Sequence, residues 1–441
     1  MKAGFARMDI TPPLGTPLGG VGEALQRRCT VIHDPIYLRA LWIEEGGHEA
    51  LVLGFDLCFL AREETDRFKG MLARNLKLWP SQVLMATSHT HAGPATGTFS
   101  DLFDAPPLRD YLRQIENAML QGARQARDGA RTVRLRAGTG RSTLPVNRRC
   151  RRDGQIVNAP NPGGPILDSM PLSLFEDEQG RPVCLLYSVS THPVAMRGKE
   201  ASADYPGAAC ALLDRHLGAT CSFFLQGAGG DSRPRPLVQG ADWNFQSGWA
   251  DVEACARIVA DEVIDAVGRV LQPVTPRVRT ALVETEWPFQ PPDRALYAAA
   301  LKRSDYQETP DKPTTGSALM NLHQKWAARQ LELLARGALR RALPVQFQGI
   351  QLAEGVRLVG IEGELLSPHG RAIERAFAGG VTYPLGYANG EGMYLPSSEM
   401  LDEGGYEVES YHEFNEPAML AKGMETIRDQ ALAELKRQGI G

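Results

Sequence analysis

The 441-residue chain contains no apolar run that approaches the ~18 residues needed to span a membrane. Its first residues, Met1 to Asp9, include no apolar segment of the kind found in secretory signal peptides. Its seven cysteines are scattered and form no Cys-x-x-Cys pair. Several of them lie inside apolar runs, where free cysteine behaves as a small core residue. These absences predict a cytoplasmic protein without a membrane span.

The chain also lacks a strong excess of charge of either sign. Its 48 lysines and arginines nearly balance 52 aspartates and glutamates, which gives a net charge of -4. The basic stretch from Arg148 to Arg152 is too short to form a nucleic-acid footprint. We therefore expect a small-molecule substrate and no nucleic-acid partner, while the oligomeric state has no signature in the sequence.

Two common glycine-containing motifs are missing as well. The stretch from Gln226 to Gly230 has neither the Gly-x-Gly-x-x-Gly spacing nor the Lys-Ser/Thr of a phosphate-binding loop, so it predicts a tight turn.

Gly230-Asp231-Ser232 is similar to the nucleophile block of GDSL-type serine esterases. However, it lies in mid-chain, arginine follows it, and no late Asp-x-x-His is present. A serine esterase is therefore the less favoured alternative.

What is present is an alternation of strand-like and helix-like segments, which indicates an α/β fold: a layered mixed β-sheet domain flanked by helices. The expected strands cover about 50–54, 83–86, 132–136, 182–190, 221–225, 278–286, 345–352, 356–361 and 381–386. The expected helices cover about 63–76, 108–127, 207–217, 251–271, 318–343 and 417–437. We expect a single domain over residues 1–441, with a helical insertion at about 290–343.

The most informative segment is Ser88-His89-Thr90-His91-Ala92-Gly93-Pro94, which follows the apolar run from Val83 to Ala86. Strand side chains alternate, so the pattern predicts that His89 and His91 point to one face. His192 likewise ends the apolar run from Val183 to Ser190. Because ligands gather beyond the carboxyl ends of strands in open α/β sheets, the two ends are expected to converge on one cleft. Neutral imidazoles so placed suit zinc, although hydrogen-bonded histidines fit the pattern too.

A carboxylate would complement these histidines as a zinc ligand. Glu362 and Glu364 both follow the strand-like run from Val356 to Ile361. The spacing alone does not choose between them.

Several motifs along the chain match one family in order. They are Ala3 to Pro13, Ser88 to Pro94, Asn147-Arg148, His192 with Ser202 to Gly207, Gly230-Asp231, Gly363-Glu364, and Tyr394 with Tyr406-Glu407. Together they make the chain resemble the catalytic N-terminal domain of the neutral/alkaline, non-lysosomal ceramidases.

This resemblance implies a zinc-dependent amidohydrolase that holds one Zn²⁺ per chain and cleaves a linear N-acyl amide with metal-activated water. By position, His89, His192, Glu364 and Tyr394 match the family's metal ligands. His91 matches a proton-transferring histidine. Arg148 and Tyr406 match groups that hold the carbonyl oxygen or the tetrahedral intermediate.

The chain departs from the family in ways that bear on the substrate. Where ceramidases carry Gly-Asp-Val-Ser-Pro, this chain has Gly230-Asp231-Ser232-Arg233-Pro234, which places Gly230, Asp231 and Arg233 in the expected substrate-binding region. Arginines also follow Arg148, and the family's C-terminal immunoglobulin-like domain is expected to be absent. Added arginines suit a substrate that is smaller or more polar than ceramide. The alternative is that the same zinc site cleaves an ester, a lactone or a sugar derivative.

Overall fold

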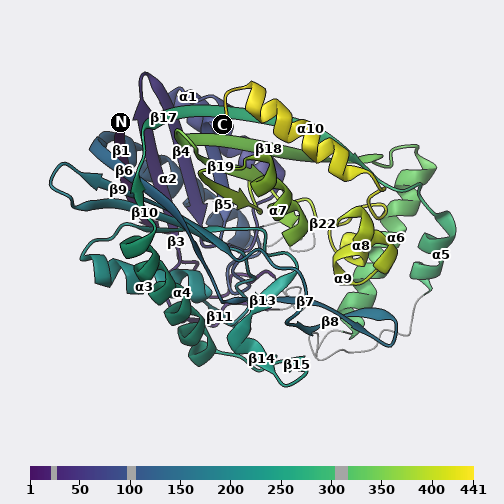
Figure 1. Ribbon diagram of the computed structural model, residues 1–441. Coiled ribbons are helices and arrows are strands. Elements are labelled where there is room, and N and C mark those ends of the chain that lie inside the picture. Colours follow the sequence, from purple (N-terminus) through teal and green to yellow (C-terminus); the bar gives the residue numbers. More distant parts are fainter. Residues whose placement is uncertain (21–26, 97–105, 303–315) are drawn as a thin grey trace.

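The computed structural model describes residues 1–20, 27–96, 106–302 and 316–441. Two β-sheets lie face to face, and helices cover the outer face of each (Figure 1). The layers thus follow the order helix, sheet, sheet, helix. This arrangement confirms the predicted α/β class with mixed sheets flanked by helices.

The larger sheet contains β1 (Lys2–Asp9), β3 (Tyr37–Glu45), β4 (His48–Phe55), β5 (Val83–Thr87), β6 (Arg131–Arg141), β9 (Ser169–Asp177), β10 (Pro182–Val189) and β12 (Ser222–Gln226), with β16 (Gln272–Pro273) beside β6. Its strand order is β12-β10-β9-β6-β1-β3-β4-β5. The outermost pairs, β10 with β12 and β4 with β5, are parallel. The pairs between them are antiparallel.

The smaller sheet has the order β17-β18-β19-β21. Its strands are β17 (Pro276–Pro288), β18 (Ala342–Ala353), β19 (Val356–Ile361) and β21 (Val381–Leu385). The first three strands pair antiparallel, whereas β19 and β21 run parallel.

Side-chain alternation along the strands divides the apolar residues between two layers of packing. In β3, Leu41 and Ile43 face the second sheet and pack in one buried cluster with Ile350 and Leu358. Trp42 points the other way, into the cluster under the helices. The strands of the larger sheet are therefore buried on both faces, which explains their nearly continuous apolar runs.

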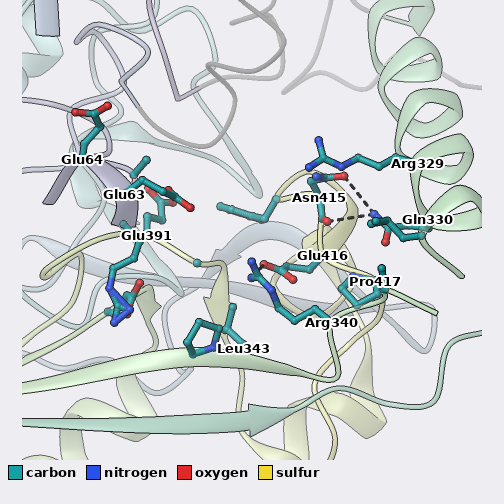
Figure 2. Close-up of a pocket in the computed structure, with 18 of the residues that line it drawn as sticks. Glu63, Glu64, Arg329, Gln330, Arg340, Leu343, Glu391, Asn415, Glu416 and Pro417 are labelled. Carbon is teal, nitrogen blue, oxygen red and sulfur yellow. Dashed lines mark hydrogen bonds and ion pairs between the residues drawn. The ribbon is translucent and has the colours of Figure 1, made fainter. Parts of the chain in front are cut away.

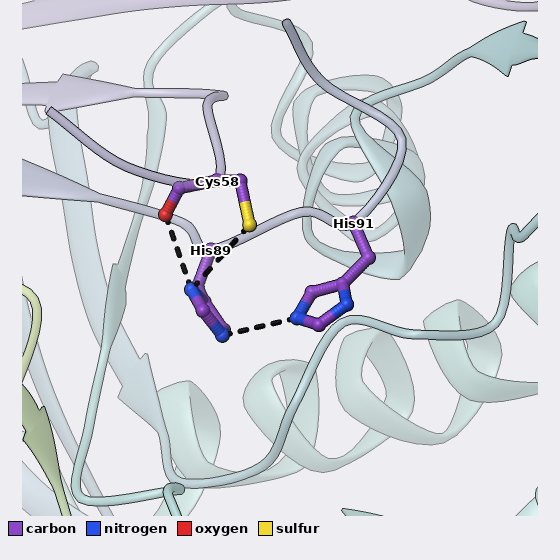
Figure 3. A group of neighbouring side chains, drawn as sticks. All are labelled: Cys58, His89 and His91. Carbon is purple, nitrogen blue, oxygen red and sulfur yellow. Dashed lines mark hydrogen bonds between the residues drawn. The ribbon is translucent and has the colours of Figure 1, made fainter. Parts of the chain in front are cut away.

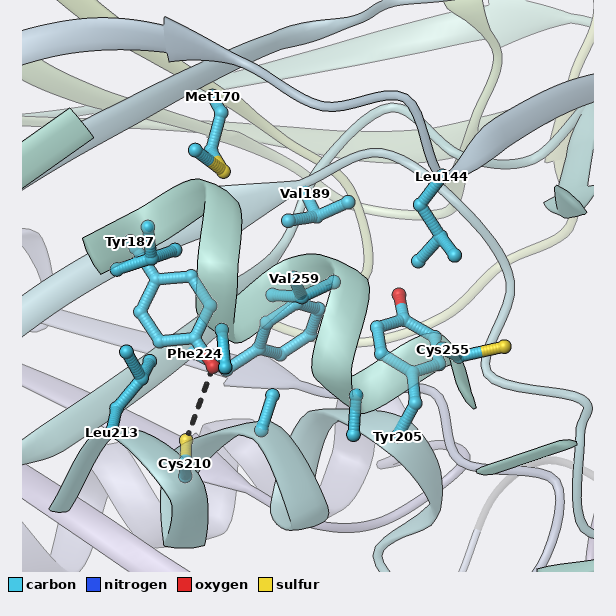
Figure 4. Packing of buried hydrophobic residues seen from close by; sticks show 14 of the residues in the cluster. Leu144, Met170, Tyr187, Val189, Tyr205, Cys210, Leu213, Phe224, Cys255 and Val259 are labelled. Atoms are coloured by element: carbon cyan, nitrogen blue, oxygen red, sulfur yellow. Dashed lines mark hydrogen bonds between the residues drawn. The ribbon is translucent and has the colours of Figure 1, made fainter. Parts of the chain in front are cut away.

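Three helix pairs cover the outer faces. They are α1 (Arg62–Leu76) with α2 (Pro106–Asp128), α3 (Asp204–Leu217) with α4 (Trp249–Arg269), and α7 (Ser367–Ala376) with α10 (Met424–Arg437). The first two pairs cover different halves of the larger sheet, and the third covers the smaller sheet. In the core beneath α3 and α4, Leu213 and Val259 pack around Tyr187, whose hydroxyl lies 3.4 Å from Cys210 Sγ (Figure 4). No helix in the described part of the chain is long and apolar enough to cross a membrane.

Short elements fill the space around the ends of the strands. They are β7 (Pro145–Arg152), β8 (Gln155–Asn161) and β13 (Ser232–Pro234); β20 (Glu364–Leu365) and β22 (Tyr394–Leu395); β2 (Val31–Ile32) and β11 (Glu200–Ala201); β14 (Val238–Gln239) and β15 (Asp242–Trp243); α8 (Ser398–Glu403) and α9 (Tyr406–Glu409); and the 3-10 turns η2 (Pro80–Gln82), η4 (Arg235–Leu237) and η5 (Ser410–His412).

Between β17 and β18 lie the helices α5 (Arg294–Leu301) and α6 (Gly316–Ala335), in the region where a helical insertion was expected. The predicted end of the long helix at Leu343 is wrong. The helix stops at Ala335, because Gly337 adopts a left-handed conformation (φ 63°) and the chain enters β18. The last helix likewise begins at Met424 and not at Pro417, directly after Gly423 (φ 99°).

The approach of β1 to α2 generates a stability prediction. A Cβ atom added to Gly4 would overlap the carbonyl oxygen of Ala126 in α2, and backbone cannot move aside cheaply. Gly4→Ala should therefore lower the free energy of unfolding by about 1–3 kcal/mol in urea denaturation. Gly70→Ala in α1 is the matched control, because its Cβ has only the tip of Arg74 nearby, at 3.5 Å. It should leave stability unchanged or raise it by about 0.5–1 kcal/mol. Equal effects of the two substitutions would contradict the packing argument.

Candidate metal centre

Strand ends from both sheets bring three potential metal ligands together. His89 follows β5, His192 follows β10, and Glu364 stands in β20, just beyond β19. Their ligand atoms all lie within 4.8 Å of one another, and the three residues are fully buried. Glu364 Oε2 is 3.4 Å from His89 Nε2 and 3.2 Å from His192 Nε2. The expectation that the two histidine-bearing strand ends converge is thus confirmed.

The backbone at His89 differs from the extended strand that the sequence predicted. Strand β5 ends at Thr87, and His89 adopts a left-handed backbone conformation (φ 64°), so strand alternation does not apply to it. The rings of His89 and His91 nevertheless meet, with their Nε2 atoms 3.1 Å apart (Figure 3). His91 is half-buried and lies next to the cluster of His89, His192 and Glu364.

Backbone carbonyls fix the orientation of both buried imidazoles. His89 Nδ1 lies 3.1 Å from the carbonyl oxygen of Cys58, and His192 Nδ1 lies 2.7 Å from that of Gly229. A ring nitrogen beside a carbonyl oxygen must be the donor, so each proton sits on Nδ1. The other ring nitrogen of each histidine, Nε2, then faces Glu364. Metal-binding histidines characteristically make this outward hydrogen bond, so the residues present fit a metal ion.

The structure places Glu364, and not Glu362, beside the histidines. Gly363 between them has a φ of 105°, a conformation that favours glycine, and the chain turns there. Glu362 points away to accept a hydrogen bond from the Gln346 amide at 3.0 Å and to pair with Arg62 at 3.3 Å. Burial raises the pKa of Glu362 to about 7, with Arg62 opposing the shift.

Two tyrosines complete the wall of the cluster. Tyr394 in β22 lies opposite Glu364 in β20, and its hydroxyl is 3.3 Å from His192 Nε2. The Tyr387 hydroxyl donates to Glu364 Oε2 at 3.2 Å, and its ring stacks on His89 with centroids 4.2 Å apart. Tyr387 was not predicted. The sequence indicated this residue only by its position directly after the expected strand at 381–386, which is β21 in the structure.

Charge around the cluster favours the protonation states that bind a cation. Burial and the nearby Arg148 lower the pKa of His192 to about 4. Burial, with His89 and His192, also holds the pKa of His91 well below its usual value. Burial alone would raise the pKa of Glu364, but the adjacent histidines lower it below its usual range. The neutral imidazole of His192 and the ionised carboxylate of Glu364 are donors that suit Zn²⁺ at neutral pH.

Arg148 borders the cluster from strand β7. Its Nη1 is 3.5 Å from His192 Nε2, and its Nε donates to Glu407 at 2.7 Å. Its Nη2 is buried and has no hydrogen-bond acceptor among the described residues. The guanidinium also lies over the rings of Tyr394 and Tyr406, at 5.3 and 5.6 Å from their centroids. The structure thus brings Arg148 and Tyr406 next to the candidate ligands.

Gly230, Asp231 and Arg233 occupy different positions relative to the cluster. A Cβ atom on Gly230 would press against the backbone of Glu364 and Leu365, so this glycine packs beneath the site. The Asp231 carboxylate accepts two hydrogen bonds from Ser367, and burial raises its pKa to about 6. The Asp231 carbonyl oxygen accepts from the Arg148 amide at 2.9 Å. Arg233 is buried over the rings of Trp243 and Phe245. A substrate contact by these three residues stays a prediction.

A second group of potential ligands shares His89 with the first. Cys58, His89 and His91 also place their ligand atoms within 4.8 Å of one another (Figure 3). Burial, together with Glu391 and Glu364, raises the pKa of the Cys58 thiol well above its usual value. The thiolate that a metal requires is therefore costly here. The group with Glu364 is the better cation site.

Glu391 is a further buried carboxyl group that the sequence analysis missed. It lies in the loop between β21 and β22, and burial and the adjacent Glu364 raise its pKa well above the usual value. Its sequence context, Gly390-Glu391-Gly392, carried no signal beyond a turn.

Comparison with solved structures identifies the fold. The crystal structure of neutral ceramidase from Pseudomonas aeruginosa superposes with a TM-score of 0.71 at 17% identity, covering 99% of this chain and 74% of that one. The chain has the neutral ceramidase fold. A structure described as ceramidase complexed with C2 gives the same TM-score and identity, with 100% and 76% covered. No protein-family model matches the sequence, and no curated protein matches it significantly. At this identity, the ceramidase likeness shows the fold.

The two overlapping ligand groups give different outcomes for metal binding. His192→Ala should reduce bound zinc, measured by inductively coupled plasma mass spectrometry, to less than a tenth of the wild-type value, because it removes an oriented ligand. Cys58→Ala, a change beside His89, the histidine that the two groups share, should keep zinc near one ion per chain. Loss of zinc in Cys58→Ala with retention in His192→Ala would assign the metal to the group that includes the thiol.

Proposed function

We propose that this protein is a zinc-dependent hydrolase that cleaves a linear N-acyl amide bond. The observation that carries the proposal is the pair of buried imidazoles whose Nε2 atoms face Glu364 while backbone carbonyls hold their Nδ1 protons. The neutral ceramidase fold supports the same conclusion. We propose His89, His192, Glu364 and Tyr394 as the ligands of one Zn²⁺ in a single domain over residues 1–441.

Zinc in such a site supplies a Lewis acid and lowers the pKa of a water molecule to about 7, which makes hydroxide available at neutral pH. The chain's own residues must then accept and deliver protons. His91 suits this role because it lies beside the ligands, is half-buried and is neutral at neutral pH. It is placed to accept a proton from the attacking water and to pass it to the leaving amine.

Arg148 suits stabilisation of the carbonyl oxygen, on which negative charge develops during hydrolysis. Glu407 and the rings of Tyr394 and Tyr406 hold its guanidinium in place. Its Nη2 has no acceptor among the described residues and is available to a substrate oxygen. One such preorganised donor typically contributes about 3 kcal/mol to catalysis. We propose that Tyr406 assists through its contact with the same guanidinium.

We also propose a substrate that is smaller or more polar than ceramide. The arginines after Arg148 no longer support this argument by themselves, because carboxylates neutralise them within the protein. Arg149 pairs with Glu407 and Glu403, and Arg151 pairs with Glu403. Stronger support comes from a cavity beside the metal centre whose walls carry charged side chains.

The same residues could act on an ester, a lactone or a sugar derivative, and the experiment below separates these classes. A serine esterase is disfavoured by the position of Ser232. Its hydroxyl is buried and donates to the carbonyl oxygen of Ser190 at 2.7 Å, so it is not poised as a nucleophile.

The proposal predicts hydrolysis of short N-acyl amides that a chelator abolishes and added Zn²⁺ restores. A panel of amides, esters, lactones and glycosides with the same acyl or glycosyl group should show the highest kcat/KM for an amide. Ceramide with a long acyl chain should turn over more slowly than a short polar amide. Activity that survives metal removal would contradict the zinc proposal. Turnover confined to esters or glycosides would contradict the amide proposal.

Arg148→Lys tests the proposed oxygen contact in the same assay. Lysine keeps the charge but cannot both pair with Glu407 and present a second fixed donor. We expect kcat to fall about 10²–10³-fold with zinc content unchanged. Arg151→Lys, on the exposed end of the same strand, should leave kcat unchanged. A normal kcat in Arg148→Lys would remove Arg148 from the mechanism.

A further inference from the structure

A cavity of about 590 Å³ lies beside the metal centre, between the start of α1, helix α6 and the loop that carries Glu391 (Figure 2). Two of its lining residues touch the candidate ligands. Glu391 contacts Glu364, and the ring of Phe414 packs on Tyr394 with centroids 5.9 Å apart. The volume lies within the range of small-molecule sites and suits a ligand of the size of a monosaccharide.

The buried charges in the cavity wall compensate one another. Arg62, at the start of α1, pairs with Glu362 at 3.3 Å. Arg340, just before β18, pairs with Glu416 at 2.7 Å. These two ion pairs contribute one guanidinium for each carboxylate, so neither presents an excess charge to a ligand.

The remaining charged residues in the wall include both signs. Glu64 pairs with Arg67 at 2.7 Å, while Glu63 and Arg329 are exposed and carry opposite charges. Glu391 accepts a hydrogen bond from a hydroxyl group whether or not it is ionised, because either form of a carboxyl group keeps acceptor lone pairs. The wall thus suits a neutral polar ligand.

The same wall offers many hydrogen-bonding groups of both kinds. An arginine in an ion pair has further N–H donors, and a paired carboxylate has further lone pairs. Gln330 adds an amide from α6. It is 1% exposed, and its Nε2 donates to the carbonyl oxygen and to Oδ1 of Asn415, at 3.2 Å each (Figure 2). Hydroxyl groups both donate and accept, and their hydrogen bonds to charged partners are the stronger ones.

Apolar side chains lie between these polar groups. Leu333, Leu343 and Phe414 line the cavity from three different segments of the chain. Carbon atoms of a ligand that carries hydroxyl groups on a ring or chain would pack against them. Alternating polar and apolar contacts therefore favour a polyhydroxyl compound over a simple alkyl chain.

We propose that this cavity binds a neutral polyhydroxyl group, such as a sugar ring, that belongs to the substrate. The assignment to the substrate rests on the proposed hydrolase function, whereas the polyhydroxyl site itself does not. The preferred substrate would then be an N-acyl amide whose amine or acyl part carries several hydroxyl groups.

Calorimetric titration tests the site without any turnover. The probes are methyl glucoside and cyclohexanol, two neutral six-membered rings that differ in their number of hydroxyl groups. They are titrated into wild type, Leu333→Trp, Gln330→Leu and the control Glu332→Trp, which changes an exposed residue of the same helix. Zinc content and thermal unfolding establish that each variant is intact.

We expect wild type to bind methyl glucoside about tenfold or more tightly than cyclohexanol. Leu333→Trp should weaken that binding by about tenfold or more, because the indole fills the cavity. Gln330→Leu should weaken it by about 2–10-fold through the loss of one amide, and Glu332→Trp should leave it unchanged. Equal affinity of wild type for the two probes, or unchanged affinity in Leu333→Trp, would overturn the proposal. Tighter binding of glucosamine or glucuronate than of methyl glucoside would contradict a neutral ligand.

Kinetics test whether the polyhydroxyl group belongs to the substrate. N-acetylglucosamine and N-cyclohexylacetamide, which share the acyl group, are compared as substrates of wild type and Leu333→Trp. We expect kcat/KM to favour the sugar amide by about tenfold or more in wild type, and the preference to shrink in the variant. Equal kcat/KM values in wild type would overturn the assignment to the substrate. Absence of turnover with every amide would instead refute the hydrolase function, and the calorimetric result would still decide the polyhydroxyl site.

Discussion

The site depends on one constraint, which is the convergence of two imidazole nitrogens and one carboxylate in the buried interior of the protein. The carbonyl oxygens of Cys58 and Gly229 determine which nitrogen of His89 and His192 faces Glu364. Cys58 follows β4 and Gly229 follows β12, and both strands belong to the larger sheet. The position of these strands therefore determines which ring nitrogen of each histidine carries the proton. These two nitrogens and the carboxylate form a group that could hold a metal ion.

Paired charges hold the residues around the cluster in fixed positions. Glu407 lies between Arg148 and Arg149 and holds both guanidiniums, and the two arginines keep the pKa of its carboxyl below its usual value. Arg148 can therefore present a free donor while remaining rigid. Glu391 also contacts Glu364, and burial and this neighbouring carboxyl group raise the pKa of Glu391 well above its usual value.

Much of this arrangement could be predicted from the sequence. The other features could not be predicted, for physical reasons. Apolar runs followed by histidine revealed the strand ends of His89 and His192, because burial and strand length are local properties. The choice of Glu364 over Glu362 depended on the left-handed turn at Gly363, which spacing does not reveal. Tyr387 and Glu391 join the site only through tertiary contacts. Arg149 and Arg151 misled the substrate argument, because their carboxylate partners lie more than 250 residues away in the sequence.

The central claim is that His89, His192 and Glu364 hold the metal with nitrogen and oxygen ligands only. X-ray absorption spectroscopy at the zinc edge of the loaded wild-type protein tests this most directly. The account predicts a first shell of nitrogen and oxygen atoms at about 2.0–2.2 Å, including two imidazoles. A sulfur atom at about 2.3 Å would show that Cys58 binds the metal and would contradict the account.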